Sequence, residues 1–306
     1  QGTPGSSMGG DPWALFLCAV LLYRGPRQSC RQGCLRRVGR RQPTKGQDCL
    51  GTGGMKDAAT AAAPAPTAEG AASEVQASPP EDATLLGAVA DAGLRAHVRS
   101  PDGSLQDVDM PAFLEAAARY REALSVMGTA VKLVLGDFEK NFSYVSVLLD
   151  EDSSGQRRRL RAYLQAELDS NVHTPGQGAS CRLRDPSGAC QLQWLLRGLE
   201  FFFTMLRLMF AGDKHAATSA YGQTLQQYHG WVTSLGIKAA LSATPGRESV
   251  CAIAELCPSP AVQEDPARLS AAITRDARRA VDALLPMVQW MIGAFKERQL
   301  WEGIQV

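Results

Sequence analysis

The sequence predicts an all-α fold, and three observations carry this prediction. From residue 84 onward, apolar residues recur every three or four positions, which is the spacing of one face of an α-helix. The segments between these stretches lack the alternation of apolar and polar residues that indicates a strand or a hairpin. No segment repeats at a regular period, which argues against a solenoid. We therefore predict one helical domain over residues 84–306.

The periodicity also predicts where the individual helices lie. We expect helices near residues 84–97, 109–149, 157–169, 190–211, 214–241, 247–257, 264–275 and 276–297. Gly128 lies near the middle of the second segment, where a glycine predicts a bend or a division. Residues 190–211 are apolar nearly all round, so we expect this helix to be central and buried.

The residues before the domain do not have the composition of a folded unit. Residues 52–83 are mainly alanine, proline, glycine and serine, and such a chain buries too little apolar surface to order itself. We predict a disordered linker there. Residues 1–51 form a tail with a short apolar run, Trp13–Tyr23, and a basic flank after it. The run is shorter than the roughly 20 residues of a membrane-spanning helix. It is either a signal or anchor segment or an amino terminus without a membrane role.

Overall composition excludes several classes of function. The chain has 306 residues and a net charge of +1, from 32 basic and 31 acidic side chains, so we expect no nucleic-acid partner. Its 8 cysteines include no C-x-x-C pair, which removes the strongest zinc and redox signatures. We predict no metal site and no cofactor. In the domain we expect free, partly buried thiols at Cys181, Cys190, Cys251 and Cys257.

Polar side chains interrupt three of the predicted apolar helix faces. Asp137 and Asn141 lie four residues apart and project together from one helix. Trp194 and Arg197 share a face of the most apolar helix, and His229 falls within another apolar face. The residues that define this last face are Tyr221, Leu225, Tyr228, Val232 and Leu235. One such residue is usually part of the core or exposed to solvent, but together these groups indicate a polar mouth on an apolar interior. An acid, an amide, an indole and an imidazole would bind the head of an amphiphile there.

The motifs around these residues resemble those of the glycolipid transfer protein family. They are "DFEKN" around Asp137, "WLLRGL" beginning at Trp194 and "YHGW" around His229. Their order and spacing match the family over residues 84–306, and the long tail resembles one branch of it. The resemblance implies a two-layer helical sandwich that encloses an apolar pocket for the lipid chains.

The resemblance also implies roles for individual residues. Asp137 would bind the ceramide amide, and His229 the acyl carbonyl. Asn141 and Trp194 would hold the first sugar. Trp231 would contact the membrane surface.

Two departures from the family pattern concern the headgroup. Tyr144 replaces the lysine of the glycolipid binders. The members that bind ceramide 1-phosphate have a lysine at the position of Asn141 and arginines at those of Cys190 and Trp194, whereas these positions are uncharged here. Other stretches, such as "SATPGRESV", are closer to the phosphate binders. Charge could come from Lys140, Arg182, Arg184 and Arg197. The sequence thus leaves phosphate and a simple sugar both open.

Three functions compete at this point. The first is a non-enzymatic carrier that moves a sphingolipid between membranes. The second is a helical protein-interaction module with a filled core. The third is a lipid hydrolase, but the chain has neither a G-x-S-x-G elbow nor an H-E-x-x-H motif. Asn141 lies in an N-F-S glycosylation sequon, and a glycan there would block the site. We therefore expect a cytosolic monomer with transient membrane contact.

Overall fold

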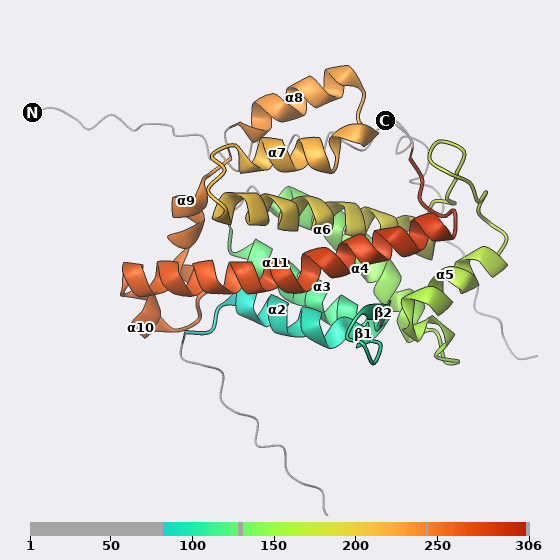
Figure 1. Cartoon of the computed structure of the whole chain (residues 1–306), viewed down its shortest axis with the longest axis horizontal. Helices are drawn as coiled ribbons and strands as arrows, with labels where there is room; N and C mark the ends of the chain where they lie inside the picture. The colour runs from blue at the N-terminus through green and yellow to red at the C-terminus, as the bar shows by residue number, and fades with distance from the viewer. Residues whose placement is uncertain (1–81, 128–130, 243, 304–306) are drawn as a thin grey trace, which may run out of the picture. The chain divides into compact units, whose positions relative to one another are not determined.

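The computed structural model describes residues 82–127, 131–242 and 244–303 (Figure 1). The predicted tail, and the predicted linker up to residue 81, lie outside this range. The longer helices are α2 (Leu85–Ala96), α3 (Met110–Ser125), α4 (Val131–Asp150), α5 (Leu160–Asp169), α6 (Gly188–Phe210), α7 (Ala216–Gln223), α8 (Trp231–Leu241) and α11 (Pro266–Glu297). The shorter elements are β1 (His97–Arg99), β2 (Leu105–Val108), η2 (Gln156–Arg158), η3 (Gln226–Tyr228), α9 (Arg247–Cys251), η4 (Ala254–Leu256) and α10 (Pro260–Gln263).

The helices pack in two layers (Figure 1). In one layer α2 packs between α3 and α11; in the other α6 packs between α4 and α7, and α8 covers α7. Contacts of α6 with α11 and of α3 with α4 join the two layers. Both faces of α6 are therefore covered, and most of its side chains are buried, as a sequence that is apolar nearly all round predicts. The predicted all-α fold is confirmed.

Local sequence signals explain where the main helices begin. Thr84, Asp109, Ser187 and Asp265 are the N-cap residues of α2, α3, α6 and α11, and each side-chain oxygen accepts a backbone N–H of the first turn. Proline occupies the first turn of both α3 and α11, where its missing N–H costs nothing. Each of these helix starts is thus specified locally, before any packing.

Several predicted boundaries need correction. The segment 109–149 divides into α3 and α4, and Gly128 lies between them, outside the described residues. The segments 264–275 and 276–297 are one helix, α11, which continues through Pro286 because that residue faces solvent. The segment 214–241 is not one helix but the succession α7, η3 and α8. The four cysteines predicted to be free thiols are free and buried.

The expectation that no hairpin would occur is wrong. Strands β1 and β2 pair antiparallel, with His97 opposite Val108, and join α2 to α3. The connecting residues Ser100–Ser104 contain a Pro-Asp-Gly sequence, and Gly103 has a φ of 84°, which glycine adopts without strain. The strands are so short that they leave almost no alternation in the sequence. The hairpin is a connection and adds no sheet layer.

The contact between α2 and α11 depends on small residues and on one buried acid. A Cβ atom at Gly93 would lie 2.2 Å from Cδ2 of Leu284, so glycine lets the two helices approach. Near the start of α2, the Asp276 side chain of α11 is fully buried and accepts hydrogen bonds from Thr84 Oγ1 (3.0 Å), Arg275 Nε (2.8 Å) and Arg279 Nη1 (3.3 Å). This acid joins the beginning of the domain to its last helix.

Three helices meet closely at Gly188, the first residue of α6. A Cβ atom there would lie 2.3 Å from the Tyr163 hydroxyl and 2.8 Å from a Glu167 carboxylate oxygen, both on α5. It would also lie 2.6 Å from Leu148 Cδ2 on α4. The other oxygen of Glu167 accepts the Ala189 N–H at 2.7 Å, which places a carboxylate at the positive end of the α6 dipole. The start of α6, which positions the site residues, therefore has no room for a side chain.

Candidate functional site

The first two candidate residues lie on α4. Asp137 is half-buried, and Asn141, one turn later, is 6% exposed. The Oδ1 atom of Asn141 has no hydrogen-bond partner within the part of the chain that the structure describes. A buried amide oxygen without a partner is costly, so its presence marks a place where a ligand or a water donor would be stabilising. Lys140 is exposed, and Tyr144 is 37% exposed.

The facing helix α6 contributes Cys190 and Trp194. Trp194 is half-buried, and its indole donates a hydrogen bond to the Cys190 thiol one turn earlier. The pKa of the Cys190 thiol is raised to about 12, chiefly by burial and further by the carboxylates of Asp185 and Glu302. The thiol is therefore neutral at physiological pH. Burial, and then nearby groups that include Asp185 and Cys190, also raises the pKa of the Tyr144 phenol on α4. Tyr144 on α4 and Cys190 on α6 therefore lie in one polar region.

Arg197 does not point to solvent but is enclosed. It is 4% exposed, and its guanidinium carbon lies 3.9 Å from the ring centroid of Tyr228, 5.1 Å from that of Trp194 and 5.3 Å from that of Trp301. Its Nη2 group donates to the backbone carbonyl of Glu302. We call Arg197 with these three rings the Arg197 cage. The cage joins α6, η3 and the segment after α11.

His229 lies close to the cage but not on a helix. It follows η3 in an extended conformation (φ −111°, ψ 137°), so the predicted helical face through it is wrong. Its Nδ1 is 2.5 Å from the Tyr221 hydroxyl oxygen, and that oxygen lies 3.2 Å from Ser234 Oγ. When the Tyr221 hydroxyl donates to Nδ1, the neutral ring carries its proton on Nε2 and can donate it to a carbonyl. Burial, and then the charge of Arg197, lowers the pKa of His229 to about 4. The imidazole is therefore neutral at pH 7, the form that suits hydrogen bonding to an uncharged lipid group.

This low pKa predicts how stability depends on pH. An unfolded histidine has a pKa near 6.5, so the unfolded chain binds the proton first as pH falls. Above about pH 6.5, His229 is neutral in both the folded and the unfolded chain and adds no pH dependence. As pH falls from there towards pH 4, this histidine lowers the free energy of unfolding by roughly 3 kcal/mol at most. We expect the wild type to lose stability more steeply than His229→Gln in this window. Urea unfolding at several pH values measures the free energy of unfolding of both proteins. If it fell equally with pH in wild type and in His229→Gln, the low pKa would not belong to His229.

Of the four candidate cations, only Arg197 is buried. Lys140, Arg182 and Arg184 are exposed. Arg182 donates through Nη1 to the backbone carbonyls of Ala179 and Cys181, the latter at 2.9 Å. Within the described residues, no group of three or more His, Cys, Asp or Glu side chains could hold a metal ion.

Some residues of this region were not predicted from the sequence. Tyr221 and Tyr228 were assigned only to an apolar face, yet they contact His229 and Arg197. Trp301 lies far along the chain, and its Nε1 donates to the Tyr228 hydroxyl at 2.8 Å. No local motif marks Trp301, because its role depends on how the chain after α11 returns to α6.

Val232 and Leu235, expected on a buried face of α8, instead face outward and are 62% and 67% exposed. Trp231, which the sequence predicts as a membrane contact, is 81% exposed. The three side chains form what we call the α8 apolar patch. Large exposed apolar side chains close together indicate a surface that contacts another apolar phase. No helix in the described ranges is long and apolar enough to cross a membrane.

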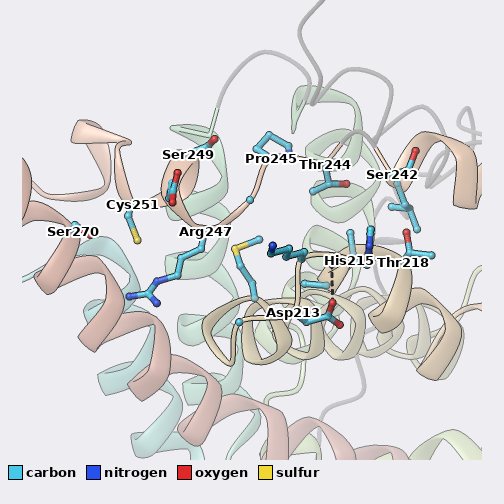
Figure 2. Close-up of a pocket in the computed structure, with 18 residues that line it drawn as sticks. Asp213, His215, Thr218, Ser242, Thr244, Pro245, Arg247, Ser249, Cys251 and Ser270 are labelled. Atoms are coloured by element: carbon cyan, nitrogen blue, oxygen red, sulfur yellow. Dashed lines mark hydrogen bonds between the residues drawn. The ribbon is translucent and has the colours of Figure 1, made fainter.

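A second polar region lies at the other end of α8 (Figure 2). A cavity of about 590 Å³ is lined by the α6–α7 turn, the end of α8, and α9. Asp213 accepts the His215 N–H at 2.7 Å within it. Its lining mixes Lys214 and Arg247 with Asp213 and Glu248. Such a lining does not suit lipid chains, and none of the candidate site residues belongs to it.

Comparisons with known proteins agree with the fold. The family described as Glycolipid transfer protein (GLTP) matches residues 108–255. The Danio rerio glycolipid transfer protein is 28% identical over 153 residues, which are 46% of this chain and 68% of that protein. The solved structure described as "How FAPP2 Selects Simple Glycosphingolipids Using the GLTP-fold" has a TM-score of 0.58 and 22% identity over 74% of this chain and 100% of that one. The structure of human ceramide-1-phosphate transfer protein with bound 12:0 ceramide 1-phosphate has a TM-score of 0.54 and 17% identity over 71% of this chain and 97% of that one.

Proposed function

Because this chain belongs to the glycolipid transfer protein family, we propose that it binds a ceramide-based sphingolipid and carries it between membranes without catalysing a reaction. One observation carries the proposal. Side chains that suit a lipid head lie buried or half-buried within an apolar domain: Asn141 on α4 and His229 beside η3 are buried, and Trp194 on α6 is half-buried. Residues 84–306 would form the lipid-binding domain, with the chains in an apolar pocket below these groups.

We propose roles for the site residues as follows. Asp137 binds the ceramide amide, and His229 binds the acyl carbonyl in its neutral form. Asn141 offers its unpartnered Oδ1 to a hydroxyl of the headgroup, and the half-buried indole of Trp194 stacks on the first sugar. This arrangement needs no nucleophile and no metal.

We favour a simple neutral sugar over phosphate as the headgroup. A desolvated phosphate needs cations directed at it. Arg182, Arg184 and Lys140 have exposed side chains, and Arg197 is occupied by three rings and a backbone carbonyl. The neutral Cys190 thiol lies near carboxylates, which disfavour a dianion.

The α8 apolar patch supplies the proposed membrane contact. An indole and two aliphatic side chains can enter the interface of a bilayer, and Trp231 suits the headgroup level. We propose that this contact is transient and occurs on cytosolic membrane surfaces.

Paired transfer assays test the headgroup. We expect Trp194→Ala to lower transfer of a monohexosylceramide between vesicles on the order of tenfold, and that of ceramide 1-phosphate much less, because only the sugar stacks on the indole. In the same assay, Trp231→Ser should lower transfer of both lipids equally, because it acts at the membrane. If Trp194→Ala lowered transfer of both lipids equally, Trp194 would not be the surface on which the sugar stacks. A greater loss of ceramide 1-phosphate transfer would favour phosphate as the headgroup.

Mass spectrometry of lipid that copurifies with the protein tests the wider proposal. A ceramide-based lipid should be found, and its mass identifies the headgroup. A protein-interaction module would copurify with no lipid of this class.

A further inference from the structure

We infer that Arg197 is a positioning residue for headgroup selectivity, which it provides by holding Trp194 from within the Arg197 cage rather than by touching the lipid. The inference rests on the proposed function, since it assigns how the same site obtains its preference for a sugar.

The contacts of Arg197 leave its charge directed at protein groups. Three aromatic rings surround the guanidinium, and the nearest, Tyr228, lies 3.9 Å away. A cation over aromatic faces is stabilised most when it is removed from water, and Arg197 is 4% exposed. The Glu302 carbonyl accepts from Nη2. A guanidinium can satisfy all these contacts at once because it is planar and has several donors, whereas an ammonium cannot.

The same contacts restrict Trp194. Trp194 precedes Arg197 by three residues on α6, so the two side chains project from one face of the helix. The guanidinium lies 5.1 Å from the indole centroid, and the indole N–H donates to Cys190 on the preceding turn. The ring is therefore held between two neighbours on its own helix. A stacking surface already held in place loses less rotational freedom when the ligand binds.

The cage itself is held by the chain segment after α11. Trp301 donates to Tyr228, and the Glu302 backbone N–H donates to Gln193 Oε1 at 2.8 Å. Gly303 N donates to the Gly178 carbonyl at 2.9 Å, which ties the segment to the loop before α6. This part of the chain, which the family match over residues 108–255 does not include, thus forms one wall of the cage. Headgroup selectivity should depend on it although it carries none of the recognised motifs.

Transfer assays with three lipids on the full chain test the inference. We compare Arg197→Lys, which keeps the charge, and Arg197→Met, which keeps the bulk, with wild type. The lipids are a monohexosylceramide, ceramide 1-phosphate and ceramide. Both variants should lower monohexosylceramide transfer about fivefold to tenfold, the range expected for one side chain that must now be ordered on binding. Transfer of the other two lipids should change less than about twofold, so the selectivity ratio falls.

Controls separate positioning from a structural role. Arg207→Gln changes an exposed arginine at the end of α6 that donates to Gln223, and it should leave all three rates unchanged. Trp301→Phe keeps a ring in the cage but removes the donor to Tyr228, and it should reproduce part of the selectivity loss. The near-ultraviolet circular dichroism of tryptophan should weaken in the Arg197 variants as Trp194 gains freedom.

Each outcome has a defined meaning. A fall in the rate of monohexosylceramide transfer relative to the rates for ceramide 1-phosphate and ceramide supports the inference. Equal losses for all three lipids, accompanied by a lower melting temperature, would overturn it in favour of a structural role. A selective loss of ceramide 1-phosphate transfer would overturn it in favour of direct phosphate contact. A wild type that moves none of the three lipids would refute the proposed function, and the inference with it.

Discussion

Asp137→Val should lower sphingolipid transfer on the order of a hundredfold while the protein keeps its fold. Asp137 is half-buried on α4, one turn before the buried Asn141. A hydrogen bond from a lipid amide to a carboxylate contributes about 1.5–3 kcal/mol, and valine of similar size removes it without leaving a cavity. Transfer of a fluorescent sphingolipid between vesicles measures the effect.

The matched control changes the same helix away from the site. Ser143→Val places the same β-branched residue at an exposed position of α4 and should leave transfer close to wild type. Asp137→Asn keeps the shape but weakens the acceptor, so it should lie between wild type and valine. Transfer that persists in Asp137→Val, with an unchanged helical circular dichroism signal, would remove Asp137 from the site.

The second large effect concerns stability. Asp276→Ala should lower the free energy of unfolding by about 3 kcal/mol. The carboxylate is fully buried, and its loss leaves the buried Thr84 hydroxyl and N–H without their acceptor. The value is at the low end for a buried ion pair because Arg275 and Arg279 are both 45% exposed and regain water. Urea unfolding measures it, with Asp282→Ala, an exposed acid on the same helix, as the control.

The same carboxylate predicts a response to acid. Burial by itself would raise the pKa of Asp276, but hydrogen bonds from Arg275, Thr84 and Arg279 more than offset burial and lower it. A lowered carboxyl pKa means that its stabilisation is complete above the unfolded value and is lost as pH falls through the folded value. The difference between wild type and Asp276→Ala should therefore be constant near neutral pH and shrink below about pH 4. A difference that grows on acidification would contradict this account.

Much of the fold could be predicted because helical periodicity and caps are local properties. The predicted segment 190–211 nearly matches α6, whose start is capped by Ser187, and the burial of α6 follows from a sequence that is apolar nearly all round. The burial of Asn141 could be predicted because the residues around it on α4 are apolar at helical spacing. In both places the local signal and the packing agree, which makes local sequence a sufficient guide.

The region of His229 could not be predicted, because there the local pattern and the packing disagree. Residues 221–235 have helical spacing, but the chain between α7 and α8 turns through η3 and becomes extended at His229. Val232 and Leu235 fit the apolar spacing in the sequence, but both side chains are exposed in the structure. An apolar face shows that a helix avoids water, and it does not show whether protein or lipid covers it.

Arg197 illustrates a different limit. The sequence places it on the same helix face as Trp194, and from that alone it could contact a charged headgroup. Its actual partners, Tyr228 and Trp301, lie in segments far from it in the chain. Which rings surround a cation depends on long-range packing. Local sequence can therefore identify the charged residue but not the groups that its side chain contacts.

The crowding at Gly188 has a consequence for natural variation in this chain. A methyl group there would meet a hydroxyl, a methyl and a carboxylate oxygen, each closer than 3.0 Å, so even alanine would force three side-chain ends on α4 and α5 to move. Gly198 and Gly293, on α6 and α11, have no atom within 4 Å of such a group. A missense change at Gly188 should therefore be depleted in a population, whereas alanine at Gly198 or Gly293 should be tolerated. The same chemical change, glycine to alanine, would be damaging or silent according to how many helices converge on the position.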